Sequence, residues 1–270
     1  MIRCERLVHV YPGGTQALAG VDLEIRAGER VAIVGQNGSG KSTLVLHWNG
    51  LLRPTTGRVL IDGQPAAGRR VAQLARIVGV AFQDPDRQIF AGKLRTEVAF
   101  GARNVGFRGA ALQRAVDEAL DLVGLRADAD ANPYDLGYSR RKLLALASIL
   151  AMATPVVVLD EPTTGQDAAG VARIRAIVHS LADAGRTVVT ISHDMRFVAE
   201  TFERVVVMGA GRVLLDGTPA ETFGEPAWPA LRATNLEPPL AALLGAEWSL
   251  GSTPTEAGLV AALAEARPRA

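Results

Sequence analysis

The sequence of 270 residues lacks several features that mark particular classes of protein. Its single cysteine, Cys4, cannot form an internal disulfide, and this fits a reducing compartment. The net charge is only +1, so the overall charge does not indicate nucleic acid or an anionic membrane surface as the main partner. The first residues lack the apolar core of a signal peptide, and no internal repeat is found. We therefore expect a globular chain, with 48% hydrophobic residues to build its core.

Long hydrophobic runs are also scarce. The longest apolar stretch, Leu143 to Leu159, is interrupted by Ser148, Thr154 and Pro155. A buried helix, a turn and a buried strand explain it better than a membrane span, which needs about 20 apolar residues. If the protein acts at a membrane, we expect another subunit to span it.

Lysine is rare, with only Lys41, Lys93 and Lys142 in the chain, so the position of Lys41 is informative. It stands in a segment that fits the phosphate-binding pattern G-x-x-x-x-G-K-[ST]. That segment reads Gly35-Gln36-Asn37-Gly38-Ser39-Gly40-Lys41-Ser42. The apolar run 31–34 before it predicts a buried strand, and residues 43–46 after it predict the start of a helix. A chance glycine-rich turn is the alternative, which this strand–loop–helix setting disfavours.

A strand that feeds a glycine-rich turn and then a helix gathers backbone N–H groups and the positive end of a helix dipole around one point. Such a point suits a polyphosphate, and glycines let the backbone approach it closely. Lys41 would reach the β- and γ-phosphates, and the Ser42 hydroxyl would bind Mg²⁺. The candidate nucleotide-binding residues of this region are Gly35, Asn37, Gly38, Ser39, Gly40, Lys41, Ser42 and Thr43.

The remaining pattern predicts an α/β fold. Apolar or alternating segments predict strands at 7–11, 21–25, 59–63, 77–82, 156–159, 187–191, 205–208 and 213–215. Apolar residues three and four apart predict helices at 110–123, 140–152, 170–183 and 196–202. Alternating strands and helices indicate a mainly parallel sheet. From about residue 225 prolines interrupt the pattern, and a helix over 254–266 closes a C-terminal appendage.

The strand at 156–159 ends in two carboxylates, Asp160 and Glu161. In a parallel sheet, a strand of this kind delivers its carboxyl end to the crevice where the phosphates bind. We expect Asp160 to hold Mg²⁺ through water and Glu161 to act as the general base that polarises the attacking water.

Three further residues are candidates because of their positions. Gln83 follows a strand, from which its amide can reach Mg²⁺ and sense the γ-phosphate; alone it would be a solvated side chain. His193 also follows a strand and can contact the γ-phosphate, with a surface histidine as the alternative. Tyr11 precedes a glycine turn and can stack on adenine, with a core or edge aromatic as the alternative.

Taken in this order along the chain, these residues resemble the ATP-binding subunits of ABC transporters over roughly residues 2–223. The resemblance implies a P-loop NTPase fold with a RecA-like parallel-sheet core, an antiparallel β portion and a helical subdomain at about 84–152. It divides the chain into an ATP-binding domain, 1–224, and a C-terminal extension, 225–270. It also implies ATP hydrolysis with Mg²⁺ in head-to-tail dimers that sandwich two ATP molecules, with Asp167 in the dimer-contact loop.

A narrower resemblance rests on residues 82–90, followed by 97–101. Both are similar to the ATPases of energy-coupling factor transporters, including those for cobalt and vitamins. This resemblance implies a micronutrient importer, with a second ABC ATPase, a transmembrane coupling subunit that contacts the segment after Gln83, and a substrate-binding membrane subunit. It places the chain at the cytoplasmic face of the membrane without a nucleic-acid partner, and the C-terminal extension would help hold the ATPase pair together.

The chain departs from the family pattern at the signature loop, which normally reads L-S-G-G-Q. The aligned residues here are Leu136-Gly137-Tyr138-Ser139-Arg140. In one interpretation this loop serves a weakened site and the chain works in an asymmetric heterodimer. In the other, Ser139 and the N-terminus of the following helix replace the usual contacts and both sites hydrolyse ATP. We favour the first.

Other classes remain open. The chain could be the ATPase of a conventional importer or exporter, or a soluble, non-transport ABC ATPase. DNA-repair members carry a long coiled-coil insertion and translation members carry two cassettes, and neither feature is present in this sequence. A small-molecule kinase is disfavoured because the carboxylate pair follows the phosphate loop by more than a hundred residues.

Overall fold

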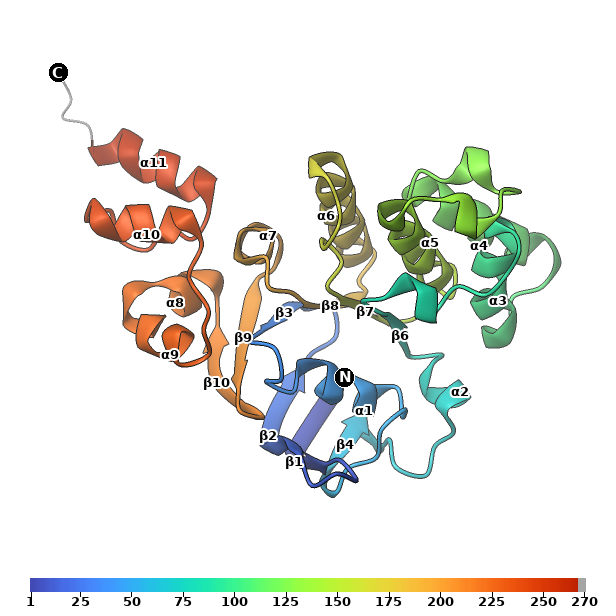
Figure 1. Ribbon diagram of the computed structural model, residues 1–270, viewed down its shortest axis with the longest axis horizontal. Coiled ribbons are helices and arrows are strands. Elements are labelled where there is room, and N and C mark those ends of the chain that lie inside the picture. The colour runs from blue at the N-terminus through green and yellow to red at the C-terminus, as the bar shows by residue number, and fades with distance from the viewer. Residues whose placement is uncertain (267–270) are drawn as a thin grey trace.

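The computed structural model describes residues 1–266, which form two β-sheets flanked by helices (Figure 1). The first sheet is antiparallel, in the order β2-β1-β4-β5. Its strands are β1 (Ile2–Val10), β2 (Gln16–Ile25), β4 (Thr56–Ile61) and β5 (Gln64–Pro65). The second has six strands, β10-β9-β3-β8-β7-β6, and all its pairings are parallel except that of the β9–β10 hairpin. These strands are β3 (Arg30–Val34), β6 (Val78–Ala81), β7 (Val156–Asp160), β8 (Thr187–Ile191), β9 (Arg204–Gly209) and β10 (Arg212–Gly217).

The five parallel strands of the six-stranded sheet are buried on both faces, which explains why they read as continuous apolar runs. The edge strand β10 instead alternates between exposed and half-buried residues. Along β7, Val156 and Val158 belong to the core shared with the antiparallel sheet, whereas Val157 and Leu159 belong to the core on the opposite face. This alternation follows from the pleat of a strand, which points successive side chains to opposite faces.

The helices occupy both sides of this sheet. They are α1 (Lys41–Trp48), α2 (Val71–Leu74), α3 (Leu94–Val105), α4 (Gly109–Leu122), α5 (Tyr138–Leu150), α6 (Ala168–Asp183), α7 (Met195–Thr201), α8 (Pro219–Phe223), α9 (Trp228–Ala233), α10 (Leu240–Glu247) and α11 (Glu256–Ala266). Helix α1 packs between the two sheets through Leu44, Val45 and Trp48. Helices α3, α4 and α5 form a separate group beyond β6 (Figure 1).

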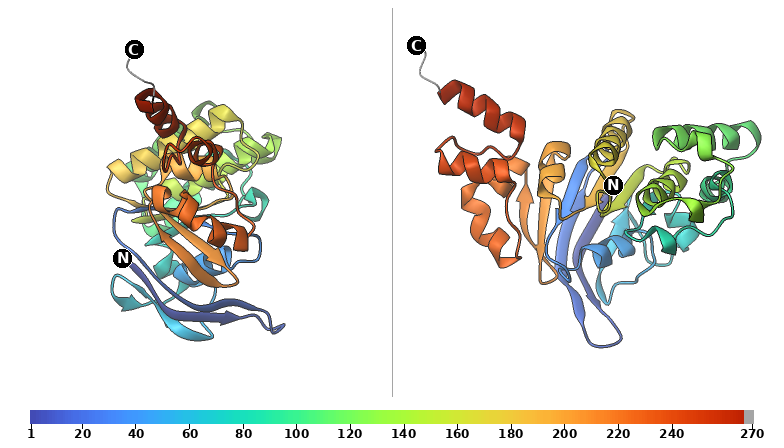
Figure 2. Two further views of the ribbon diagram at one scale, coloured as in Figure 1. Left: turned by 90° about the vertical axis from the view of Figure 1, so that its left-hand side faces the viewer. Right: turned by 45° about the horizontal axis from the view of Figure 1, so that its top comes forward.

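The C-terminal helices lie at the opposite end of the central sheet from the α3–α5 group (Figure 2). Helix α8 packs on the β9–β10 hairpin, and α10 packs on α11. Phe223, Leu231 and Leu236 are buried in the same core as β9, so the beginning of this extension is part of the domain's packing. Among residues 1–266, none of the helices is both long and apolar enough to cross a bilayer.

The mixed α/β architecture agrees with the sequence prediction. Each predicted strand and helix is present with shifts of a few residues at its ends, including the C-terminal helix, which is α11. Helices α2, α3, α8, α9 and α10 and the short strand β5 were not predicted from the sequence. The boundary at residue 224 stays a prediction.

Candidate functional site

A cleft of about 650 Å³ opens at the carboxyl end of the parallel strands, where ligands bind in open α/β sheets. The phosphate loop forms its floor. Residues from strand ends far apart in the sequence complete it: Tyr11, Gln83, Asp160, Glu161 and His193. Every candidate site residue named from the sequence lines this cleft except Ser39, which is buried beneath the loop.

Close packing explains two glycines of the loop. A Cβ atom on Gly40, whose φ is +100°, would lie 2.4 Å from the Ala17 carbonyl oxygen. On Gly35 it would lie 2.2 Å from the Met208 carbonyl oxygen. The loop is therefore pressed against β2 on one side and the end of β9 on the other, and only glycine fits both positions.

The ammonium group of Lys41 is held by the loop itself. Nζ donates to the carbonyl oxygens of Gly35 (2.6 Å) and Gln36 (2.9 Å), and to Ser39 Oγ (3.3 Å). Burial lowers the pKa of Lys41, while the carboxylates of Glu161 and Asp160 raise it. The cleft therefore has a cation on its loop side and carboxylates on its strand side.

Ser42 and Asp160 meet across the cleft, and Ser42 Oγ donates to Asp160 Oδ2 at 3.2 Å. Burial raises the pKa of Asp160 to about 6, with the neighbouring Glu161 carboxylate adding to the rise and the Ser42 hydrogen bond opposing it. Together with the Gln83 amide in the same cleft, the donors are hydroxyl, carboxylate and amide oxygens. Hard oxygen donors of this kind suit Mg²⁺, and a dication would favour the ionised form of Asp160, so these residues fit the ion.

Glu161 and His193 form the second polar pair. His193 Nδ1 lies 2.7 Å from Glu161 Oε2, and the Glu161 side chain is only 11% exposed whereas that of His193 is 66% exposed. They come together because β7 and β8 are neighbours, with Asp160 opposite Ile191. Glu161 has a φ of +51°, a strained conformation for a residue with a side chain. Such strain persists where the surroundings enforce it, and it concentrates at functional sites.

Tyr11 lies at the rim of the cleft. Its hydroxyl is 3.1 Å from Thr43 Oγ1 on α1, and its ring makes an edge contact with His9 at 4.6 Å between centroids. The strand end and the helix that carries the phosphate loop are thereby joined at this rim.

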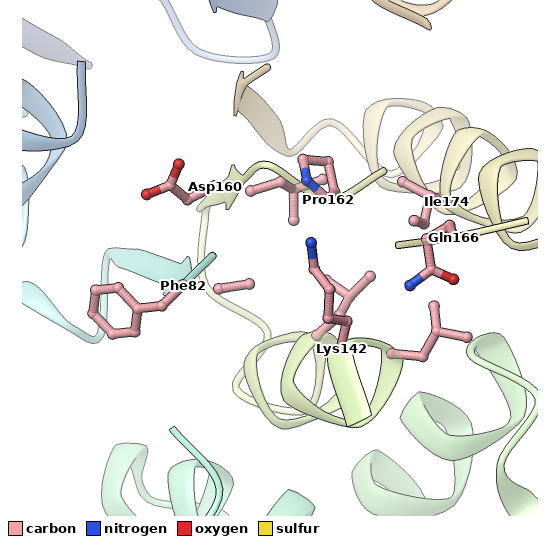
Figure 3. A pocket seen from close by; sticks show the side chains of 10 residues that line it. Phe82, Lys142, Asp160, Pro162, Gln166 and Ile174 are labelled. Carbon is pink, nitrogen blue, oxygen red and sulfur yellow. The ribbon is translucent and has the colours of Figure 1, made fainter. Parts of the chain in front are cut away.

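Lys142 was missed by the sequence analysis as a functional candidate. It lies on α5, is only 7% exposed, and its ammonium points toward the chain that follows Asp160 (Figure 3). Nζ donates to the carbonyl oxygens of Glu161 and, at 3.1 Å, Thr164. Burial lowers its pKa to about 8 against the opposing effect of the carboxylates. The signal that could have identified it is its place directly before the apolar run 143–147, in a chain with three lysines.

The atypical signature loop packs against the loop that follows Glu161. Ser139 Oγ donates to Gln166 Oε1 at 2.7 Å, and Gln166 Nε2 donates to the Ser139 carbonyl at 3.0 Å. The Tyr138 ring covers Gly165, where a Cβ atom would lie 2.9 Å from the ring. The hydroxyl that could replace the usual serine is thus engaged within its own chain. Asp167 caps α6 by accepting from the Gly170 N–H at 2.7 Å.

A contribution of the C-terminal extension to the cleft was not anticipated: Asn235 and Leu236 line it beside the phosphate loop. Composition gave no signal for them because their role depends on a contact with a segment about two hundred residues away.

Comparison with known proteins shows the family of this chain. Residues 18–164 match the family model described as "ABC transporter". The energy-coupling factor transporter ATP-binding protein EcfA of Methanocaldococcus jannaschii is 39% identical over 246 residues, covering 90% of this chain and 88% of that protein. A putative ABC transporter ATP-binding protein of Methanosarcina acetivorans is 42% identical over 240 residues, but the match spans only 39% of its length.

Solved structures share the fold of this chain. CbiO1 from Clostridium perfringens, part of the ABC transporter complex cbiONQ, has a TM-score of 0.75 at 37% identity, covering 87% of this chain and 94% of that one. The ATP-binding cassette MJ0796, whose dimer holds ADP and Pi, has a TM-score of 0.75 at 27% identity, covering 81% of this chain and 98% of that one. The predicted family and fold class are confirmed.

Proposed function

Since this chain belongs to the ABC transporter family of ATPases, we propose that it powers a membrane importer of the energy-coupling factor type. One observation carries the catalytic part of the proposal. A single cleft places the phosphate loop opposite the Ser42–Asp160 pair and the Glu161–His193 pair. The similarity to EcfA and CbiO1 supports the transporter type.

In this proposal the loop amides and Lys41 bind the phosphates of ATP. Ser42, Gln83 and Asp160 hold Mg²⁺, which supplies charge neutralisation at the β- and γ-phosphates when bound. Lys41 exchanges its contacts with loop carbonyls for contacts with phosphate oxygens, which are stronger acceptors because they are charged.

Glu161 orients the attacking water in line with the γ-phosphate and accepts its proton on the carboxylate. His193 Nδ1 lies 2.7 Å from Glu161 Oε2 and fixes the carboxylate, while its exposed ring lines the same cleft. Lys142 donates a hydrogen bond to the carbonyl of Glu161. This contact holds the strained backbone of Glu161 so that its carboxylate stays in the cleft. Because hydrolysis depends on placing a water correctly, such anchoring contributes directly to the rate.

The proposed surface for the membrane partner lies on the segment after Gln83 and on α3. Phe90 and Phe100 are 59% and 49% exposed and stack edge to face at 4.7 Å between ring centroids. Neighbouring Gln88 ties this segment to α5, because its side-chain amide donates to the Ala145 carbonyl at 2.7 Å. A shift at the aromatic pair is therefore transmitted to the helix that carries Lys142.

The signature loop favours the asymmetric heterodimer. Ser139 is bonded to Gln166 and Tyr138 covers Gly165, so both are occupied within the chain. We propose that Glu161 and the phosphate loop of this chain work with a normal signature from the partner ATPase, while this chain's own signature completes a weakened site. The proposed substrate is a vitamin or transition-metal ion, which a separate membrane subunit selects.

The experiment is Mg²⁺-dependent ATP hydrolysis by the isolated chain, compared with the chain co-purified from detergent-solubilised native membranes. We expect activity mainly in the complex, with a second ABC ATPase and a polytopic membrane protein present in stoichiometric amounts. Brisk hydrolysis by the isolated homodimer would contradict the asymmetry. Full activity without any membrane partner would favour the soluble, non-transport alternative.

A further inference from the structure

The wall of the nucleotide cleft contains a segment of the C-terminal extension. Asn235 and Leu236 line the cleft together with the phosphate loop. They follow α9, which lies with α8 beside the β9–β10 hairpin (Figures 1 and 2). The extension was expected to pair subunits, a task that does not require it to touch the site for ATP.

Two hydrogen bonds join this segment to Gln36, the second residue of the phosphate loop. The Gln36 N–H donates to Thr234 Oγ1 at 3.1 Å, across 198 positions of sequence. Asn235 Nδ2 donates to Gln36 Oε1 at 2.6 Å. The Thr234 hydroxyl in turn donates to the Met208 carbonyl at 3.0 Å, the same oxygen that Gly35 closely approaches. One hydroxyl therefore bridges the end of β9 and the start of the loop.

The segment is held firmly enough to position the loop. Thr234 is fully buried and Leu236 is 8% exposed. The N–H groups of Thr234 and Leu236 both donate to the Leu231 carbonyl at 3.0 Å, which fixes the turn at the end of α9. Asn235 adopts a φ of +51°, a conformation that asparagine tolerates better than most residues with a side chain. Removing the Thr234 hydroxyl would leave the N–H of the half-buried Gln36 without its acceptor, which is a costly defect.

We propose that Thr234 and Asn235 are positioning residues of the nucleotide site, which make the affinity for ATP depend on the docked C-terminal extension. They hold Gln36 so that the loop amides converge on the phosphates before ATP arrives, and preorganisation of this kind raises affinity. Linkage is reciprocal, so bound ATP must stabilise the docked segment by the same factor.

The extension continues into α10 and α11, where Leu240 and Val260 are 69% and 65% exposed. The inference rests on the proposed nucleotide site.

The test uses the full chain and the non-hydrolysable analogue AMP-PNP with Mg²⁺. Thr234→Val removes the hydroxyl and preserves the shape. The matched control is Thr253→Val, because Thr253 is a buried threonine of the same extension whose hydroxyl donates to the Ala241 carbonyl at 2.8 Å, away from the loop. We expect Thr234→Val to raise Kd about tenfold, because it removes both hydrogen bonds of this hydroxyl and leaves the Gln36 N–H without its acceptor. Thr253→Val should leave Kd within about twofold. Equal affinities for Thr234→Val and the parent would overturn the inference.

A second arm separates positioning from general destabilisation and remains decisive if Thr234→Val does not fold. Asn235→Gly keeps the left-handed backbone and removes the amide, and Gln36→Ala removes its partner. The double variant should lose no more affinity than the weaker-binding single variant, because both substitutions remove the same hydrogen bond between Asn235 and Gln36. Hydrogen exchange of residues 228–236 should slow when AMP-PNP binds. The inference would be refuted if the losses of affinity in the two single variants added up in the double variant. It would also be refuted if AMP-PNP left the hydrogen-exchange rates of residues 228–236 unchanged. A parent chain that binds no nucleotide would instead refute the proposed function.

Discussion

Replacing Lys142 with methionine perturbs the buried contact behind the catalytic carboxylate. Lys142 is 7% exposed and donates to the carbonyls of Glu161 and Thr164. Burial lowers its pKa from 10.5 to about 8. That difference corresponds to roughly 3 kcal/mol spent on keeping the ammonium charged at neutral pH. Methionine removes this penalty but leaves the buried carbonyl of Glu161 and the half-buried carbonyl of Thr164 without this donor, at about 1–3 kcal/mol each. At pH 7 the two effects oppose each other, so the free energy of unfolding should change by no more than about 3 kcal/mol.

The pH dependence should be much clearer than the change at pH 7. Between the folded pKa of about 8 and the ordinary value of 10.5, the unfolded lysine binds a proton that the folded one has released. Stability rises with pH wherever the unfolded state binds more protons. The free energy of unfolding of the parent, minus that of Lys142→Met, should therefore increase with pH above 8, by up to about 1.4 kcal/mol per pH unit.

The assay is urea unfolding of the parent and of Lys142→Met at a series of pH values from 7 to 10. Lys93→Met is the control, because the Lys93 side chain is 58% exposed and only faces Asp130 at 3.5 Å. The difference in free energy of unfolding between the parent and Lys93→Met should not change with pH. A flat or falling difference for Lys142→Met would refute the reasoning about the buried ammonium. We also expect kcat for ATP to fall about 10- to 100-fold in Lys142→Met, because misplacing a reacting group costs that much.

Three other predictions follow from the packing. Gly40→Ala should abolish ATP binding and lower Tm by several degrees, because its Cβ atom would lie 2.4 Å from a carbonyl oxygen of β2. Gly13→Ala should match the parent, since a Cβ atom there would have nothing within 4 Å. Binding of ATP by Gly40→Ala would contradict this prediction. Burial raises the pKa of Cys4 to about 12, so Ellman's reagent at pH 8 should label it only in the unfolded chain, and rapid native labelling would be contrary evidence. Phe90→Ser should reduce co-purification with the membrane partner at unchanged ATP affinity; undiminished co-purification would argue against the aromatic surface.

The sequence was most informative where local pattern and tertiary structure agree. The central strands are buried on both faces, so their apolar runs identified them directly, and the strand–loop–helix around Lys41 defines its own conformation. Asp160, Glu161 and His193 could be placed together because parallel strands end at one edge of the sheet. Helix α3, which buries Leu94 and Val98, was not predicted, because Gly101 and its β-branched residues have low helix propensity.

The features that could not be predicted from the sequence depend on contacts between segments far apart in the chain. Lys142 and Thr234 act through backbone carbonyls and N–H groups, which carry no residue-type signal at the partner position. The closure of the cleft by the extension depends on the turn after α9, which brings Asn235 to Gln36 across 199 positions. The strain at Glu161 was likewise invisible, since no residue pattern marks a left-handed glutamate.

Glu161→Gln tests the central claim most directly. The change keeps the shape of a buried side chain and removes its capacity to accept a proton. Glu256→Gln is the control, because the Glu256 carboxylate is 60% exposed and its ion pair within residues 1–266 is with the exposed Arg196. In the native complex, Glu161→Gln should bind Mg·ATP as tightly as the parent and hydrolyse it at least about 100-fold more slowly. Turnover at the parental rate by Glu161→Gln would show that the catalytic group lies elsewhere.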